Sequence, residues 1–431
     1  MKNKYKEIII SNTAEAFRRN IEKIKDEKEI SRRLSIEHNL CQRAFFWNGD
    51  DKVVITPYPI EPISLRVNSE ILGYRNVKNI SPKKTVVSLC EALEKDENTF
   101  VDLVNIIKSN RNILITPYAI TDEFLQLIDK LHKLKLRFVV PELPKPDNIW
   151  TVKYLDSKSG FRETLHKMQA KNKNIRLPFG LICKNIKEAN NVGQWFLDNQ
   201  ISCVFKSNFG ESGWGLKILK NDQTKNAEKK TDKDGIWNDT LIVVEEYIQS
   251  DINASGGSPS VEVCVKEYGP KVTYICGQIV DSLGSFGGVS LGNNILDKNI
   301  AKDLRRLGAI VGKEYWKMGY RGYFDIDVVV AKNSKEIYLI ETNTRRTGGT
   351  HVYDIAKKLF GTKWEKKNFL ISNDQFCYGK KVIAPKIIFD KIKNLLYPMK
   401  NSHSGIIVTI INEGQPFMGV VLVGRDKVEC L

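Results

Sequence analysis

The chain has 431 residues, a formal net charge of +16 and a hydrophobic content of 42%. No stretch approaches the roughly 20 apolar residues that a membrane-spanning helix needs, and the early apolar run at residues 8–10 is too short for a secretory signal, so we expect a cytoplasmic protein without membrane contact. The excess lysines are spread along the chain and mixed with acids, which argues against a nucleic-acid partner, and the oligomeric state stays open.

Residues 1–150 have the pattern of an α/β domain. Asn12 is placed to cap a first helix, and Thr121 is placed to cap a later one. Two short apolar runs, at 53–60 and 113–120, each end at a proline and are predicted to be buried strands. Strands that alternate with helices predict a parallel sheet. A domain boundary is marked by three prolines, at 141, 144 and 146.

Beyond this boundary the order of elements changes. Apolar periodicity predicts helices near 159–172 and 186–199, and a helix that ends at Gly319. The Gly/Ser-rich segment 281–294 is predicted to be a loop, and the segment 380–431 one short helix and two strands. Further strands are predicted at 180–183, 202–206, 241–248, 260–268 and 271–280.

A glycine-rich turn follows directly after the apolar run that ends at Lys206. Its glycines, Gly210, Gly213 and Gly215, have the order G-x-x-G-x-G and are followed by a second apolar run. A dinucleotide fingerprint must open a helix, and a Walker loop ends in Gly-Lys-Ser/Thr, so neither fits a strand–loop–strand order. Glycines still let backbone N–H groups approach phosphates closely. The alternative is a plain glycine hairpin with an exposed lysine.

Residues 322–343 form a predicted β-hairpin rich in acids. A turn centred on Ser334 would place Asp327 opposite Glu341, and Asp325 opposite Asn343. Like charges directly opposed on a sheet destabilise it, and oxygen ligands suit a hard cation such as Mg²⁺. The hairpin therefore predicts a metal site, with a solvated acidic face as the alternative. We also expect one strand face to be shared by four residues, Ile337, Leu339, Glu341 and Asn343.

Two arginines, Arg345 and Arg346, follow this hairpin and precede a glycine turn and a predicted helix at His351. Arginines beside a metal site suit a phosphate, a carboxylate or a developing oxyanion. The alternative is that either arginine pairs with the acids of the hairpin. His351 is a candidate base, although a histidine at a helix start more often has a structural role.

Together, the order of these segments resembles the ATP-grasp superfamily. The matching features are Lys206 with its glycine loop, VVEEYI at 243–248, the strand of Asp327 and IETN at 340–343. The resemblance implies a mixed α/β and α+β architecture, with an ATP-grasp fold between an N-terminal pre-ATP-grasp α/β domain and a small C-terminal appendage. The implied domains are 1–150, 151–370 with a lid subdomain at about 175–248, and 371–431.

The resemblance also implies ATP and Mg²⁺ as cofactors. The lysines that contact the ATP phosphates would be Lys206 and an earlier one, best matched by Lys158, with Lys167 and Lys171 as rivals. The glycine loop over the phosphates would use Gly210, Ser212, Gly213 and Gly215. The adenine pocket would be lined by Glu245, Glu246 and Ile248, partly through backbone atoms. Magnesium would be carried by Asp327, Glu341 and Asn343.

A narrower similarity, carried by ETNTRRTGGTH at 341–351 and SPSVEV at 258–263, is to the pheganomycin-type peptide ligases. It implies an ATP-dependent carboxylate–amine ligase that acts on small-molecule acids and amines through an acyl phosphate. The oxyanion would be stabilised by Arg345, Arg346 or Arg321. The alternatives are a non-peptide ATP-grasp ligase and a nucleotide-binding module without ligase chemistry.

Overall fold

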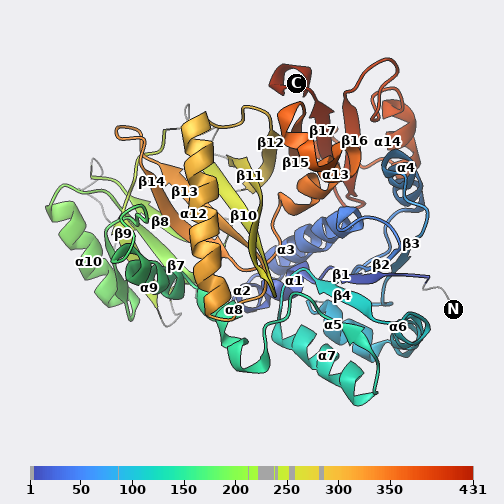
Figure 1. Ribbon diagram of the computed structural model, residues 1–431, viewed down its shortest axis with the longest axis horizontal. Helices are drawn as coiled ribbons and strands as arrows, with labels where there is room; N and C mark the ends of the chain where they lie inside the picture. Colours follow the sequence, from blue (N-terminus) through green and yellow to red (C-terminus); the bar gives the residue numbers. More distant parts are fainter. Residues whose placement is uncertain are drawn as a thin grey trace.

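The computed structural model of the protein describes residues 4–85, 87–211, 213–221, 237, 241–251, 258–280 and 286–430. In these residues the strands form three sheets, which Figure 1 shows side by side. The N-terminal sheet is parallel, as predicted, and has the strand order β3-β2-β1-β4-β5. Its strands are β1 Glu7–Ile10, β2 Lys52–Ile55, β3 Val77–Ile80, β4 Ile113–Pro117 and β5 Phe138–Val139.

Apolar side chains hold both faces of this parallel sheet. One face packs on α5 (Leu89–Lys95), α6 (Glu97–Ser109) and α7 (Asp122–Lys133), and the other on η1 (Cys41–Phe46). The predicted cap at Thr121 is confirmed, because its hydroxyl accepts a hydrogen bond of 3.1 Å from the Phe124 N–H.

The predicted cap at Asn12 is wrong. Its side chain instead accepts from the Tyr118 N–H at 3.0 Å and donates to the Ala119 carbonyl at 3.0 Å. Asn12 thus ties the end of β1 to the segment after β4. The helices that follow are short, α1 (Thr13–Ala16) and α2 (Arg18–Ile21), and precede α3 (Glu27–Leu40).

A four-stranded sheet with the order β6-β9-β7-β8 follows α8 (Trp150–Asp156) and α9 (Lys158–Gln169). Helix α10 (Ile186–Asp198) covers one face, where Ala189 and Phe196 pack against Cys203 and Phe205. The opposite face of the sheet carries Lys206. The strands are β6 Gly180–Cys183, β7 Cys203–Glu211, β8 Trp214–Leu219 and β9 Ile242–Glu246.

The third sheet has eight strands, in the order β14-β13-β10-β11-β12-β15-β17-β16. The long helix α12 (Lys298–Lys317) packs on one part of it, and α13 (Thr350–Phe360) on another. The strands are β10 Ser258–Lys266, β11 Gly269–Val280, β12 Phe286–Gly292, β13 Gly322–Val330, β14 Ile337–Asn343, β15 Phe369–Cys377, β16 Gly405–Ile411 and β17 Phe417–Gly424.

Strand β12 corrects the loop predicted at 281–294 over Phe286–Gly292, whereas residues 281–285 lie outside the described part of the chain. Its glycines predict a loop rather than a strand, yet the segment pairs with β11 and β15, and Val289 and Leu291 are buried. A side chain at Gly288 would place its Cβ 2.0 Å from the Ser372 carbonyl oxygen, so close strand packing requires glycine there.

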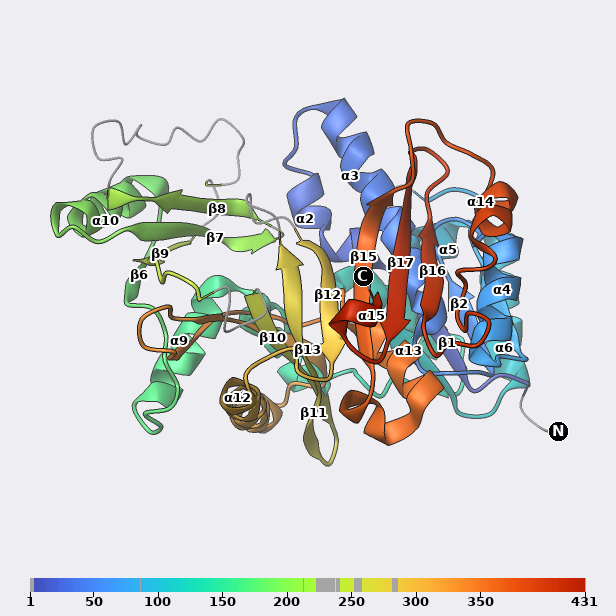
Figure 2. The same cartoon turned by 90° about the horizontal axis from the view of Figure 1, so that it is seen from above.

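The C-terminal strands continue the eight-stranded sheet, and α14 (Pro385–Ile392) lies beside α4 (Pro62–Leu72) in Figure 2. The last described helix is α15 (Lys427–Cys430). The domain boundaries at 150/151 and 370/371 stay predictions.

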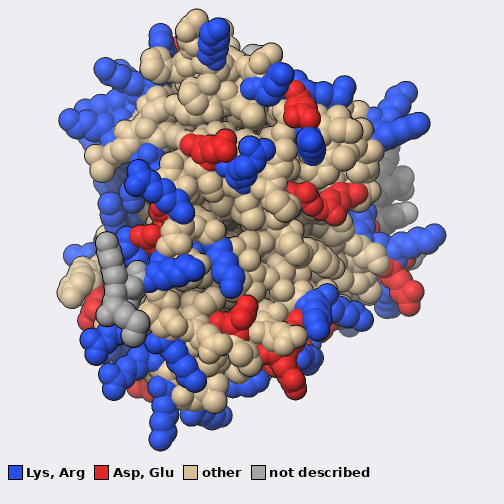
Figure 3. Space-filling view, turned by 90° about the vertical axis from the view of Figure 1, so that its right-hand side faces the viewer, with Lys and Arg blue, Asp and Glu red and all other residues tan. Residues whose placement is uncertain are grey.

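The basic side chains are dispersed over the face of the molecule drawn in Figure 3, as their spread along the sequence suggests. On the face drawn in Figure 3, lysine and arginine side chains lie scattered, with acids between them. None of the described helices combines the length and the apolar character that crossing a bilayer requires.

Candidate active site

The acidic hairpin has the predicted register where its acids lie. Asp327 is opposite Glu341, and Asp325 is opposite Asn343. The register then shifts, because Val328 is opposite Leu339, which leaves Ile340 as an extra residue in β14. The prediction that Ile337 and Leu339 share a face with Glu341 and Asn343 is therefore wrong: this β-bulge turns the two apolar side chains into the core.

The bulge also directs a main-chain carbonyl toward a cation. Lys206 Nζ donates to the Ile340 carbonyl at 3.0 Å and forms an ion pair with Glu245. Lys158 Nζ lies 2.6 Å from Glu341 Oε2 and donates to the Gly210 carbonyl at 3.0 Å. Both lysines are buried. The two predicted phosphate-binding lysines thus reach the same end of the acidic hairpin.

The carboxylates of the hairpin have opposite electrostatic environments. Burial would raise the pKa of Glu341, but Lys158 and Lys206 outweigh it and lower this pKa to about 2. Burial, Asp325 and Glu341 together raise the pKa of Asp327 well above its usual range. Its Oδ2 accepts a hydrogen bond of 3.0 Å from Asn343 Nδ2, and Gln278 Nε2 donates to its Oδ1. Glu341 is thus charged, whereas Asp327 forms no ion pair with any of the described side chains.

These oxygens suit a divalent ion. The carboxylates of Asp327 and Glu341 lie opposite each other at one strand end beside the side-chain amide of Asn343, whose nitrogen faces Asp327 and whose oxygen faces Arg345. A cation there would relieve the opposition of the two acids. Among the described residues, no group of three or more His, Cys, Asp or Glu side chains is placed to hold a metal.

The four-stranded sheet faces the hairpin with a mixed apolar and charged surface. Lys206 pairs with Leu216 and Val243 on the neighbouring strands, and Ile182 pairs with Val243, so these side chains share one face. The exposed fractions of Ile182, Leu216 and Ile218 are 40%, 43% and 38%. The sequence predicted these residues as parts of apolar strands but not their place on the exposed face of the sheet, which the alternation in WGLKIL at 214–219 signals.

Glu245 and Glu246, which are predicted to line an adenine pocket, lie at the end of β9. The Glu245 carboxylate is held by Lys206 and by Arg162 Nη1 at 3.2 Å. Glu246 Oε1 accepts from the Phe179 N–H at 2.7 Å, and the half-buried Ile248 follows β9. Arg162 was not foreseen, and it also donates to two main-chain carbonyls, of Pro178 and Gly180, at 2.8 Å each.

The glycine turn connects two strands, as predicted. Gly213 and Gly215 have φ angles of +79° and +75°, which only glycine adopts easily. A Cβ at Gly210 would lie 2.5 Å from the Trp214 carbonyl oxygen. Ser212, which we predicted to contact phosphate, lies outside the described residues.

Of the three candidate arginines, the structure brings only Arg345 to the predicted metal ligands. Its Nη1 donates to Asn343 Oδ1 at 2.9 Å and lies 3.6 Å from Asp156 Oδ1. Arg346 is buried and makes two hydrogen bonds to the Glu142 carboxylate, of 2.5 and 2.6 Å. Arg321 donates to main-chain carbonyls of Tyr320 and Trp316, at 2.7 and 3.3 Å.

His351 is not in contact with this site. It is fully buried near Phe46, and burial together with Arg43 lowers its pKa well below the usual range. The imidazole is therefore neutral and enclosed by the core.

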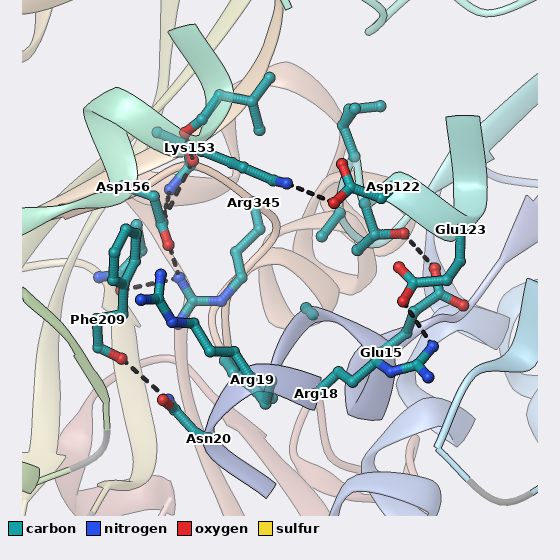
Figure 4. A pocket seen from close by; sticks show the side chains of 18 of the residues that line it. Glu15, Arg18, Arg19, Asn20, Asp122, Glu123, Lys153, Asp156, Phe209 and Arg345 are labelled. Atoms are coloured by element: carbon teal, nitrogen blue, oxygen red, sulfur yellow. Dashed lines mark hydrogen bonds and ion pairs between the residues drawn. The ribbon is translucent and has the colours of Figure 1, made fainter. Parts of the chain in front are cut away.

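A pocket of about 440 Å³ opens from the hairpin toward the N-terminal part of the chain (Figure 4). Lys158, Asn343 and Arg345 line one end, while Phe17 and Arg19 enter from the short helices that follow β1. The opposite wall is made of ion pairs, Arg18–Glu123 at 2.7 Å and Lys153–Asp122 at 2.5 Å. No local pattern marks Phe17 and Arg19 as site residues, because only the tertiary fold brings them here.

The chain was compared with known proteins. No protein-family model matches it. A curated relative, the butirosin acyl-carrier protein–L-glutamate ligase of Niallia circulans, is 24% identical over 256 residues, which cover 56% of this chain and 53% of the relative. The chain therefore spans about half the length of the curated relative that it matches.

Solved structures match nearly the whole chain. An ADP complex of an N5-carboxyaminoimidazole ribonucleotide synthetase has a TM-score of 0.53 at 10% identity, covering 100% of this chain and 95% of that one. The biotin carboxylase domain of 2-oxoglutarate carboxylase from Hydrogenobacter thermophilus, with MgADP, ADP and bicarbonate, has a TM-score of 0.53 at 13% identity, covering 98% and 86%. Because these neighbours are ATP-grasp proteins, the chain has the ATP-grasp fold, as its sequence predicted.

Proposed function

We propose that this protein is an ATP-dependent carboxylate–amine ligase that forms a peptide-type amide bond through an acyl phosphate. The observation that carries the proposal is the convergence of Lys158, Lys206 and the acids Asp327 and Glu341 at one strand end. The pocket of about 440 Å³ opens from this same point and has room for a small substrate.

ATP and Mg²⁺ are the proposed cofactors. The apolar face of β6 and β8, together with Glu245, Glu246 and Ile248, would hold the base, and Lys158 and Lys206 would hold the phosphates. Asp327, Glu341 and Asn343 would bind Mg²⁺, which offsets phosphate charge when it is bound. The ADP and MgADP complexes of the structural neighbours support this choice.

The chemistry needs no nucleophile from the protein. A carboxylate oxygen of the acid substrate attacks the γ-phosphorus, the bond to ADP breaks, and an acyl phosphate forms. The lone pair of an amine then attacks the acyl carbon, and phosphate leaves as the amide forms and the amine loses its proton. Lys158 and Arg345 stand at the end of the pocket where the acid would lie.

We assign the stabilisation of the tetrahedral oxyanion to Arg345, among the three candidates. Arg346 is occupied by Glu142, and Arg321 by main-chain carbonyls. Loss of one donor of this kind typically lowers the rate about 100- to 1,000-fold.

The amine and the acid are proposed to be amino acids or small peptides. A second candidate, a substrate attached to a carrier protein, is favoured by the similarity to the N. circulans ligase, whose name specifies an acyl-carrier protein and L-glutamate. Testing each acid both free and attached to a carrier protein separates the two.

The decisive experiment is a screen of amino acids and small peptides with ATP and Mg²⁺, in which phosphate release and product mass are measured. We expect one acid–amine pair to give ADP, phosphate and an amide in equal amounts, and chelation of the metal to stop the reaction. Binding of ATP without substrate-dependent phosphate release from any free or carrier-bound acid would instead indicate a nucleotide-binding module.

A further inference from the structure

The outer end of β7 projects beyond its own sheet. β9 pairs with β7 only from Cys203 to Ser207, and the pairing with β8 is interrupted between Lys206 and Glu211. Residues 208–210 therefore lie outside the regular ladder. Their polar groups must find other partners, since an unpaired buried polar group is costly.

The first set of partners comes from the start of α9. The Ser159 N–H donates to Asn208 Oδ1 at 2.9 Å, and Lys158 Nζ donates to the Gly210 carbonyl at 3.0 Å. Lys158 is also the residue that pairs with Glu341. Lys158 thus links the position of Gly210 to the acidic hairpin.

The second set comes from α2, in a different part of the chain. Asn20 Nδ2 donates to the Phe209 carbonyl at 2.9 Å, across 189 residues of sequence. The guanidinium carbon of Arg19 lies 4.4 Å from the centre of the Phe209 ring. Figure 4 shows these residues together at one wall of the pocket, opposite the ion pairs of Asp122 and Glu123.

We propose that Arg19 and Asn20 are positioning residues that hold the projecting end of β7 against the pocket. Without them Phe209 would move away, and Gly210 would move with it from Lys158. The projecting end of β7, which leads into the glycine turn, would then lose its contacts with α2 and keep those with α9. The effect on turnover rests on the proposed function, whereas the effect on the strand does not.

The structural effect can be measured by hydrogen exchange on the full-length protein. Asn20→Asp removes the donor to Phe209, and Arg19→Met removes the cation but keeps an apolar side chain over the ring. We expect amides at positions 208–210 to exchange about fivefold faster in each variant, while those of Ile242–Glu246 keep their rate. A matched control is Arg66→Met on α4, whose arginine forms an exposed ion pair with Glu70.

The catalytic effect is measured as the ratio of ATP consumed to amide formed, together with kcat and KM. We expect Asn20→Asp and Arg19→Met to lower kcat about tenfold and to raise this ratio above one, and Arg19→Lys to recover part of the loss because it restores a cation over Phe209.

Three outcomes decide the inference. Exchange rates equal to those of Arg66→Met would overturn it, as would a loss of turnover with unchanged exchange, since that would indicate direct substrate contact. Faster exchange without any acid–amine pair that supports turnover would support the positioning role and contradict the proposed function alone.

Discussion

Lys158 and Lys206 each contact a carboxylate, Glu341 and Glu245 respectively. Two buried lysines would be costly if they lacked partners, so these ion pairs keep the site charge-balanced. If ATP and Mg²⁺ bind as proposed, Lys158 and Lys206 would exchange these carboxylates for phosphate oxygens. Glu341 would exchange Lys158 for the metal ion.

This exchange predicts that single substitutions stop turnover. Lys206→Ala and Glu341→Gln should each reduce ADP release to background with the right substrates, because one removes a proposed phosphate contact and the other a proposed metal ligand. Circular dichroism should show that both variants still fold. Lys133→Ala, which removes an exposed lysine paired with Asp129, is the control. Full activity in both site variants would refute the assignment.

A second prediction concerns Glu262, which is buried and accepts hydrogen bonds from Thr273, Tyr274 and Thr350. Burial raises the pKa of Glu262 from 4.5 to about 8. Between these values the folded protein binds more protons than the unfolded chain, so the free energy of unfolding should fall as the pH rises toward about 8.

Glu262→Gln removes this titration and should flatten that dependence, with a stability gain over the parent that grows with pH. Each unit of pKa difference corresponds to about 1.4 kcal/mol. Urea denaturation of both proteins across about pH 5 to 9 measures it. Parallel curves for the two proteins would show that Glu262 does not titrate in this range.

At the scale of elements, the acidic hairpin shows what local sequence can predict. Alternation and a turn near Ser334 were enough to pair Asp327 with Glu341. The bulge at Ile340 was not predictable, because it depends on how β14 fits between the core and Lys206. The role of Arg346 was not predictable either, since its partner, Glu142, lies 204 residues away. Local sequence patterns thus predict which acids lie opposite each other in the hairpin, whereas tertiary packing decides which cations lie beside them.

The glycine hairpin gives a prediction at this scale. A methyl group at Gly210 would press against the Trp214 carbonyl and shift the end of β7 away from Lys158. Gly210→Ala should therefore raise KM for ATP and lower kcat, by about tenfold in kcat/KM if the shift costs one hydrogen bond. Steady-state kinetics measure this change. Gly414→Ala, where the Cβ would make an ordinary contact of 3.6 Å with Asn412 Oδ1, should match the parent, and unchanged kinetics in Gly210→Ala would contradict the argument.

At the scale of the whole molecule, the parts of the chain are joined by buried charges. Arg346 follows β14, while Glu142 follows β5, and a further hydrogen bond of 2.8 Å joins Arg346 to the Pro117 carbonyl. The guanidinium also stacks on Tyr323, 4.3 Å from the ring centre. These contacts fix the N-terminal sheet beside the strand that carries Glu341.

Arg346→Met should destabilise the protein strongly, since removing one partner of a buried ion pair commonly costs about 3–5 kcal/mol. The double variant with Glu142→Leu should recover much of this loss, because no buried charge is then left alone. Urea denaturation measures both. A single variant as stable as the parent would show that the pair contributes nothing, and a loss of turnover beyond the loss of folded protein would indicate a catalytic role.

The eight-stranded sheet has one more consequence, for synthesis on the ribosome. Gln42 and Ile411, 369 residues apart, exchange hydrogen bonds of 2.8 and 3.1 Å, and Phe45 and Phe46 share a core with Ile407 and Val421. Phe45 and Phe46 are therefore made before the strands that bury them, so a nascent chain exposes these two side chains until β16 and β17 have been made. Chaperones that bind apolar segments would protect this stretch in the meantime.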